Sequence, residues 1–403
     1  MPAPNTGYSA CIAAQLLFQG KSGGCVKASE VRVVHVTTGL EIGGAEVMLV
    51  KVLKELEASN IRAIVCSLLG EGALSERARH YADDVINVQP AALMRNPARL
   101  MKVSRQLARF QPHIIQGWMY HGNLVATVMH KTLARHSRLF WNLRCSEPTP
   151  GSRSAEWVRR MGIRYSQLPE RIVVNSESGL AYHKAVGYKA NDYRVIGNGI
   201  DATTFAPDGQ ARSACRQRLG LPDEAFVIGI SARYREMKDY ATFFQAVERF
   251  GKQVADAYVL VCGSGVDATV PELTDYNRQQ LESERLHLLG ELEDMPGFMN
   301  ALDVFTLSSK TGEGFPNVIA EAMACAKPCV VTDSGDSQRI VGECGMTVSP
   351  QDPQALANAW QRLYAMSPDV RADIGTRARQ RAVNEYDIAS VGAAYRELYT
   401  SVP

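Results

Sequence analysis

Residues 304–333 read VFTLSSKTGEGFPNVIAEAMACAKPCVVTD, and this stretch decides the fold class. Its two ends are short runs rich in apolar and β-branched residues, which predict buried strands. Between them, the spacing from Pro316 to Ala324 predicts a helix, and Pro316 suits the first helical position. A strand, a helix and a second strand in strict turn predict a parallel sheet covered by helices on both faces.

The same alternation continues on both sides, from Val31 onward. The segment YRVIGNGIDATTFAPDG, residues 193–209, interrupts it, and we interpret this segment as a linker because Gly, Asn, Asp and Pro disfavour regular structure. We therefore predict an α/β protein of two doubly wound, Rossmann-like domains that face each other across a cleft at the carboxyl ends of their strands. The last helical stretch, about 368–399, is long and strongly charged. The expected parts are a loose tail at 1–30, domains at 31–197 and 198–385, and a C-terminal helix at 386–403 that crosses back to the first domain.

Composition indicates a folded globular protein, since 46% of the 403 residues are hydrophobic and 21% are charged. The apolar run at 11–18 is shorter than the ~20 residues of a spanning helix and no basic residue precedes it, so we expect neither a membrane span nor a secretory signal. Nine cysteines without paired zinc-ligand spacing predict buried thiols in a cytoplasmic protein, and no metal site is expected.

The net charge of +2 conceals a basic region. Residues 95–171 contain fourteen Lys and Arg but only three Glu. Such a surface can attract nucleic acid, anionic lipid or a phosphorylated substrate, although it is as often an ordinary solvated helix face. No nucleic-acid motif is present, so no nucleic-acid partner is expected. We predict that the cations between Arg95 and Arg164 contact anionic membrane, with Trp157 as an interfacial anchor.

Two stretches at strand ends are suited to bind an anion. In GLEIGGAE, residues 39–46, Gly43 and Gly44 let backbone amides approach a ligand at the start of a helix, although a plain tight turn is the alternative. In RYREMKDY, residues 233–240, Arg233 can grip phosphate oxygens as a fork and Lys238 adds a point charge. The alternative for the second stretch is a surface ion pair of Lys238 with Asp239 or Glu236.

Two further stretches offer groups for a sugar. In EGFPNVIAE, Glu313 lies in a loop and Glu321 in the second helical turn, where a carboxylate can accept two hydrogen bonds from a vicinal diol. Free amides from Gly314 to Asn317 stand beside it. In WMYHGN, before a helix expected at 123–133, His121 can bond a hydroxyl, although a lone histidine is more often a structural cap.

These motifs, together with VVNSES, IGNGID, VCGSG, LLGELEDM and the extended run EGFPNVIAEAMACAKPCVVTDSGDSQRIVG, resemble the retaining glycosyltransferases of family four, which have the GT-B fold. The resemblance covers nearly all of residues 31–385 and is most specific from Glu313 to Asp336. The chain is similar above all to transferases of bacterial surface-polysaccharide biosynthesis. The tail before Val31 has no counterpart in it.

The resemblance implies roles at the matching positions. Arg233 and Lys238 would bind the diphosphate of a nucleotide sugar, Glu321 the ribose, and the backbone of Leu289 and Gly290 the base. The implied catalytic residues are His121, Glu313, Arg233 and Lys238. The implied donor-binding residues are Gly43, Gly44, Arg233, Lys238, Leu289, Gly290, Gly314, Phe315, Asn317 and Glu321.

The resemblance also implies the reaction. The acceptor would attack from the face that the diphosphate leaves, with retention of configuration and without a protein nucleophile, a metal or another cofactor. A UDP-sugar is the favoured donor of a hexose or N-acetylhexosamine. The implied acceptor is a glycan or a polyprenyl-diphosphate-linked sugar, used for exopolysaccharide or lipopolysaccharide at the inner face of the cytoplasmic membrane.

Other functions remain as alternatives. Gly263, Gly265 and Ala268 form G-x-G-x-x-A after an apolar run, which indicates an NAD-dependent oxidoreductase with Glu282 or Glu284 on the ribose. Asp267 and Pro271 stand against this interpretation, because they add negative charge and delay the helix. A nucleotide-sugar epimerase or hydrolase of the same fold would need an acid and base pair that no motif supplies. A lectin-like module would not need a diphosphate clamp.

Overall fold

The structure is a computed structural model that describes residues 30–89, 97–145, 152–254, 256–267, 269–270, 273 and 285–401, without the side chains of 97–100. The predicted tail, apart from Glu30, lies outside the described residues. So do five residues of the sequence-based hypotheses, namely Arg95, Ala268, Pro271, Glu282 and Glu284.

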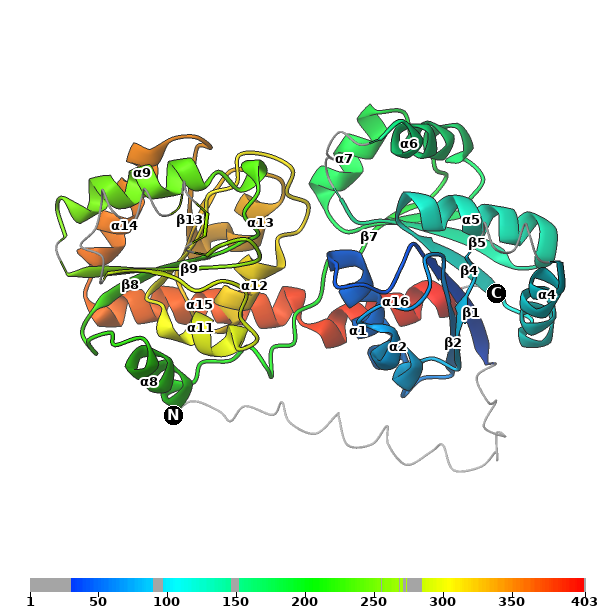
Figure 1. The fold of residues 1–403 in the computed structure, drawn as a ribbon, viewed down its shortest axis with the longest axis horizontal. Coiled ribbons are helices and arrows are strands. Elements are labelled where there is room, and N and C mark those ends of the chain that lie inside the picture. The colour runs from blue at the N-terminus through cyan, green and yellow to red at the C-terminus, as the bar shows by residue number, and fades with distance from the viewer. Residues whose placement is uncertain are drawn as a thin grey trace, which may run out of the picture. The chain divides into compact units, whose positions relative to one another are not determined.

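The first half of the chain forms a parallel sheet of seven strands in the order β3-β2-β1-β4-β5-β6-β7 (Figure 1). Every neighbouring pair is parallel, so all strands end at the same edge. The strands are β1 (Val31–Thr37), β2 (Ile61–Ser67), β3 (Asp84–Asn87), β4 (Ile114–Trp118), β5 (Arg138–Leu143), β6 (Arg171–Val174) and β7 (Tyr193–Val195).

Both faces of this sheet are buried, because successive side chains of a strand point to opposite sides. Val33 of β1 belongs to one apolar cluster and Val34 to the other. One face is covered by α1 (Gly44–Leu56), α2 (Ser75–Tyr81) and α16 (Ile388–Thr400). The other is covered by α4 (Pro97–Phe110), α5 (Met119–Leu133), α6 (Arg153–Tyr165) and α7 (Glu177–Ala185).

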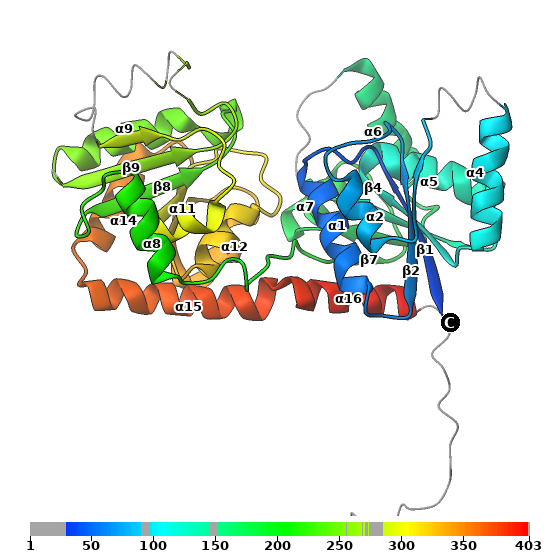
Figure 2. The same ribbon diagram turned by 60° about the horizontal axis from the view of Figure 1, so that its bottom comes forward.

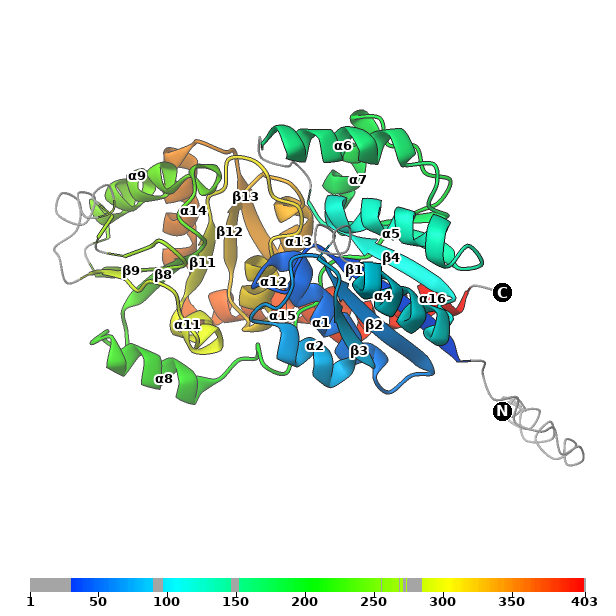
Figure 3. The ribbon, with the colours of Figure 1, turned by 45° about the vertical axis from the view of Figure 1, so that its right-hand side comes forward.

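The second half forms a parallel sheet of six strands in the order β10-β9-β8-β11-β12-β13, several of which lie side by side in Figure 3. One apolar cluster joins this sheet to its helices. The strands are β8 (Phe226–Ser231), β9 (Ala257–Cys262), β10 (Leu286–Leu288), β11 (Val304–Leu307), β12 (Cys329–Thr332) and β13 (Gly345–Val348). The helices are α8 (Gly209–Arg218), η1 (Glu236–Lys238), α9 (Tyr240–Gly251), α11 (Met295–Ala301), α12 (Asn317–Ala324), α13 (Ser337–Val341), η2 (Gly342–Cys344), α14 (Pro353–Tyr364) and α15 (Pro368–Tyr386).

The predicted α/β class with two doubly wound, Rossmann-like domains is confirmed. In each sheet the strand order reverses next to the first strand, between β1 and β4 and between β8 and β11. The loops that leave the two strands of such a pair diverge to opposite faces and leave a crevice, where ligands of open α/β sheets bind. Among the described residues, no helix is both long and apolar enough to cross a bilayer.

Two helices with a break at Asp387, α15 and α16, occupy the helical stretch expected at 368–399. At the break the linker pairs with the chain: Ile200 N donates to Tyr386 O (2.9 Å), and Ile388 N donates to Ile200 O (2.8 Å). The linker therefore bonds the backbone carbonyl before the break and the backbone amide after it. Figure 2 shows α15 beneath the second sheet and α16 beside α1.

Buried polar groups fix α16 on the first sheet. The Tyr395 hydroxyl accepts hydrogen bonds from Asn142 Nδ2 (2.8 Å) and Arg144 Nη1 (3.0 Å), both at the end of β5. The Tyr399 hydroxyl donates to Gln116 Oε1 of β4. Since buried donors are costly without a partner, these tyrosines specify where the last helix docks.

Replacing Tyr395 with Phe keeps the buried ring but leaves the donors of Asn142 and Arg144 without their acceptor. We expect the free energy of unfolding to fall by about 1–3 kcal/mol, the cost of an unsatisfied buried polar group. Tyr364→Phe is the control, because its partly exposed hydroxyl contacts only Asp256 (3.2 Å). Thermal melting of both variants checks this, and an equal shift in the two would contradict it.

Candidate functional site

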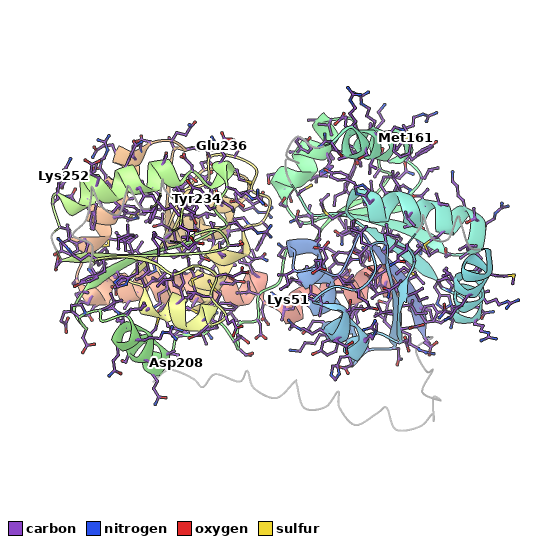
Figure 4. All side chains as sticks on the ribbon, in the orientation of Figure 1. Lys51, Met161, Asp208, Tyr234, Glu236 and Lys252 are labelled. Carbon is purple, nitrogen blue, oxygen red and sulfur yellow. The ribbon has the colours of Figure 1, made fainter. Side chains whose placement is uncertain are left out.

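A cavity of about 1120 Å³ lies at the switch point of the second sheet. Its walls come from the loops that follow β8, β9, β10 and β11 and from the first turns of α12, as expected where loops diverge. Figure 4 labels Glu236, one of the lining residues, on the loop after β8. The other lining residues that matter here are Arg233, Lys238, Gly263, Glu291, Leu292, Asn317 and Glu321.

The loop after β8 brings both predicted cations to the cavity. Arg233 is exposed, and within the described part of the chain it has no ion-pair partner. Lys238 is half-buried and forms an ion pair with Glu313 from the loop after β11. The alternative pairings are therefore wrong, since Glu236 binds Lys310 (2.8 Å) and Asp239 caps α9.

Glu313 is held from two sides. Its Oε1 accepts from Lys238 and from the Ser309 hydroxyl, and its side chain is only 8% exposed. The Ser308 hydroxyl donates to Lys238 O (2.8 Å), which ties the same two loops together. Lys238, predicted to bind the diphosphate, and Glu313, predicted to contact the sugar, are thus in direct contact across the switch point.

Glu321 faces the cavity from the second turn of α12, as predicted for its place in the helix. Burial raises the pKa of its carboxyl, and the positive charge of Lys51 on α1 opposes this shift. Lys51 is labelled in Figure 4, and its Nζ donates to Gly199 O (2.9 Å). Sequence reasoning missed Lys51, although it stands among the buried apolar residues of α1, an unusual place for a lysine.

The turn from Gly314 to Asn317 precedes α12. Gly314 O accepts from Asp336 N (3.1 Å), and the Phe315 ring packs edge-on against Tyr386. Pro316 is the cap residue rather than the first helical residue, because its extended backbone lets the helix begin at Asn317. No side chain caps this helix, and the Ile319 amide bonds back to Pro316 O (3.2 Å), so the amides of Asn317 and Val318, which line the cavity, can serve a ligand there.

Leu289 and Gly290 follow β10 at the edge of the same region. The Leu289 amide donates to Val261 O (2.9 Å), and Gly290 O accepts from Gly263 N (2.7 Å). Those two backbone groups are therefore occupied, which leaves Leu289 O and Gly290 N for a base. Their neighbours Glu291 and Leu292 line the cavity.

The predicted residues of the first domain do not line this cavity. Gly43 caps α1 without a side-chain hydrogen bond, and a side chain on Gly44 would meet open space, so the amides there are accessible. Burial raises the pKa of Glu46 in the same turn, and the charge of Arg233 opposes this shift. The helix α5 begins at Met119 and not at Asn123 as predicted, so His121 lies in its first turn. The His121 side chain is exposed there.

The dinucleotide fingerprint does not lie at a switch point. Gly263 and Gly265 follow β9, whereas the first strand of this sheet, next to the reversal, is β8. Gly263 has φ of 140°, and a Cβ there would lie 1.9 Å from Ala232 O. Close packing of two loops therefore accounts for this glycine without a bound dinucleotide.

The described residues contain no group of three or more His, Cys, Asp or Glu side chains that could hold a metal ion. The seven cysteines within the described ranges are unpaired thiols, and five of them are buried.

The two halves of the chain match two family descriptions. Residues 42–204 match "Glycosyltransferase Family 4", and residues 225–366 match "Glycosyl transferases group 1". The lipopolysaccharide core biosynthesis glycosyltransferase LpsE of Rhizobium meliloti is 27% identical over 68% of this chain and 79% of its own length. A UDP-Gal:α-D-GlcNAc-diphosphoundecaprenol α-1,3-galactosyltransferase of Escherichia coli is 29% identical over 51% of this chain and 53% of its own.

Solved structures share the fold. HepE of Anabaena, in complex with UDP, superposes with a TM-score of 0.79 at 22% identity and covers 92% of this chain and 100% of its own. The family matches favour neither an oxidoreductase nor an epimerase or hydrolase. The chain belongs to the glycosyltransferases of the group 1 and family 4 type, with the GT-B fold.

Proposed function

We propose that this enzyme transfers a hexose or N-acetylhexosamine from a UDP-sugar to a glycan or a polyprenyl-diphosphate-linked sugar in polysaccharide biosynthesis, with retention of configuration and without a metal ion. The observation that carries the proposal is the switch-point cavity, whose lining combines Arg233, Lys238 and the Glu321 carboxylate. The names of the relatives agree with it, since one includes UDP-Gal and a diphosphoundecaprenol acceptor and another lipopolysaccharide core synthesis.

The diphosphate of the donor would bind the two cations. Arg233 is exposed at the cavity and can present its planar fork to phosphate oxygens. Lys238 carries three N–H groups, of which Glu313 engages one, so two are left for phosphate. The uncapped amides at Gly43 and Gly44 would add to this positive field.

The rest of the donor would bind around α12. Glu321 would accept the two ribose hydroxyls, and Leu289 O and Gly290 N would contact the base. The amides of the turn from Gly314 to Asn317 would face the phosphate and the hexose, beside the start of the helix. Because only backbone groups would contact the base in this arrangement, the preference for UDP would depend on the shape of the space around the base.

The chemistry would need no protein nucleophile. The bond from the anomeric carbon to the diphosphate breaks, the acceptor oxygen bonds to the same face, and its proton passes to the departing phosphate. Arg233 and Lys238 would stabilise the negative charge that develops on the leaving group. Glu313 would stand near the reacting carbon, and His121 would bind a sugar hydroxyl from the first domain.

The acceptor would be presented at an anionic membrane surface. On α6, Trp157 is 59% exposed, and Arg153, Arg160 and Arg164 are exposed on the same helix. A helix with cations around an exposed tryptophan is suited to a headgroup region. A cytoplasmic enzyme held there would meet lipid-linked acceptors, in keeping with the basic charge of this part of the chain.

The proposed donor site predicts a pH-dependent affinity for UDP. UDP should raise the melting temperature of the protein by mass action, and GDP or NAD should raise it less. Glu321→Gln should weaken UDP binding about tenfold to a hundredfold, because a charged hydrogen bond contributes ~1.5–3 kcal/mol. Burial raises the pKa of Glu321, so its carboxylate gains a proton at a higher pH than an exposed glutamate does, and wild-type affinity should fall as the pH drops through that pKa.

Calorimetric titration of UDP between pH 5 and 8 checks this, with Glu291→Gln as a control for a second carboxylate on the cavity wall. Because the terminal phosphate of UDP also titrates, with a second pKa of about 6, the Glu321→Gln variant should show a shallower pH dependence than the wild type, and the control should match the wild type. Unchanged affinity in Glu321→Gln would refute the ribose assignment. A stabilising effect of NAD alone would refute the transferase proposal.

The two cations should differ in their effect on stability. Arg233→Ala should abolish most UDP binding and change the free energy of unfolding by less than about 0.5 kcal/mol, since an exposed side chain is lost. Lys238→Ala should also weaken binding but lower stability by about 3–5 kcal/mol, because the buried Glu313 carboxylate would lose the cation with which it forms an ion pair. Paired titration and melting curves test this, and Lys238→Ala with wild-type stability would contradict the importance of the ion pair.

Membrane contact through α6 predicts binding to anionic vesicles. The Arg153→Ala/Arg164→Ala double variant should bind phosphatidylglycerol vesicles about tenfold more weakly or worse, since each surface cation contributes ~1 kcal/mol. Arg249→Ala/Lys252→Ala, at the last turn and the C-cap of α9, is the control with the same charge change. Cosedimentation that is insensitive to anionic lipid, to salt or to the α6 variant would refute this surface.

A further inference from the structure

The linker between the two sheets touches the turn that begins α12. Asn198, which is 5% exposed, donates from Nδ2 to Asn317 Oδ1 (2.6 Å) and to Phe315 O (3.3 Å). Gly197 beside it packs on the Phe315 ring, 3.6 Å from where a Cβ would lie. One linker side chain therefore holds both ends of the turn, of which Pro316 and Asn317 line the cavity.

Arg144, at the end of β5, orients the Asn198 amide. Its Nη2 donates to Asn198 Oδ1 and to Gly197 O (3.2 Å), and its Nη1 donates to Tyr395 Oη (3.0 Å). An arginine has only donors, so the Asn198 oxygen must face Arg144 and the NH₂ group must face the turn. The side-chain chemistry alone thus settles which way the amide points.

Arg144 itself is firmly held. It is buried, burial lowers its pKa, and its guanidinium lies over the Trp118 ring at 5.6 Å. In the ranges that the structure describes, no carboxylate pairs with it; Asn142, Asn198 and Tyr395 surround it with neutral dipoles. A buried charge with such partners is costly to place, which favours a specific role over general stabilisation.

Asn198 and Arg144 do not line the cavity, whereas Asn317 does. Any effect of Asn198 on a ligand must therefore pass through the turn. Small displacements of such a turn matter, because a misplacement of ~1 Å can cost about a hundredfold in rate.

We propose that Asn198, oriented by Arg144, is a positioning residue that holds the turn from Phe315 to Asn317 so that its amides meet the donor. This inference rests on the proposed function, since it assumes a nucleotide sugar in the cavity. It links the linker and the first sheet to the donor site through three side chains. An aspartate could replace Asn198 toward Arg144 but would lose the donor toward the turn.

The test is the affinity for UDP-glucose, measured by calorimetry. Asn198→Ala should weaken binding about tenfold or more, and Asn198→Asp should also weaken it while melting close to wild type. Asn300→Ala is the matched control, because Asn300 is a buried amide (2% exposed) with bonds to Ala206 O (2.9 Å) and Pro296 O (3.0 Å), and it contacts α12 only through Cys325 Sγ (3.8 Å) at the opposite end of that helix, among the described contacts. This control should melt earlier but bind UDP-glucose as wild type does.

A double-mutant cycle separates positioning from general destabilisation. In the Asn317→Ala background, Asn198→Ala should cost clearly less affinity than in the wild type, because residues that act through one another are not additive. Additive losses, or equal losses in Asn198→Ala and Asn300→Ala, would overturn the inference. Failure of the wild type to bind UDP-glucose or UDP would instead refute the proposed function, so the two failures are distinguishable.

Discussion

Parallel strands that are buried on both faces impose the constraint on which the rest of this structure depends. Every strand must return by a helix, so all strands end at one edge and their loops gather there. The reversal of strand order between β8 and β11 then sends neighbouring loops to opposite faces. Two segments 75 residues apart, at Lys238 and Glu313, meet for this reason alone.

The distribution of charge follows from the same geometry. Lys238 lies deep enough to need Glu313 as a partner, whereas Arg233, five residues earlier, stays at the solvent side of the cavity. Lys51 and Glu321 form a second, more distant pair of opposite charges that influence one another's pKa. A donor with two phosphates would therefore meet one exposed cation, Arg233, and one that an ion pair already holds, Lys238.

Much of the fold could be predicted from the sequence, because buried strands leave a clear apolar signal. The helix between β11 and β12 and the position of Glu321 in its second turn agree with the spacing of the sequence. Local patterns could not reveal the break at Asp387, since it depends on a backbone pairing with Ile200. The early start of α5 could not be predicted either, because Met119 at its beginning has a positive φ of 61°, a backbone conformation that residues other than glycine rarely adopt.

The site was only partly predictable, because its residues follow from strand ends but their partners follow from tertiary contacts. Residue types at strand ends indicated which side chains could bind phosphate and sugar, because topology brings strand ends together. The partners of those side chains depend on tertiary contacts. The sequence contains no local signal that Lys238 contacts Glu313 or that Asn198 contacts Asn317.

The pairing at Ile200 has a mechanical consequence. The chain passes from one sheet to the other near Ile200 and returns near Asp387, and the two passages are hydrogen-bonded to each other through Tyr386 and Ile388. Two interdomain segments that are hydrogen-bonded to each other act as one hinge instead of two. Any rotation of one domain against the other must bend both passages at the same few peptide units, which permits swinging about this point and resists independent twisting.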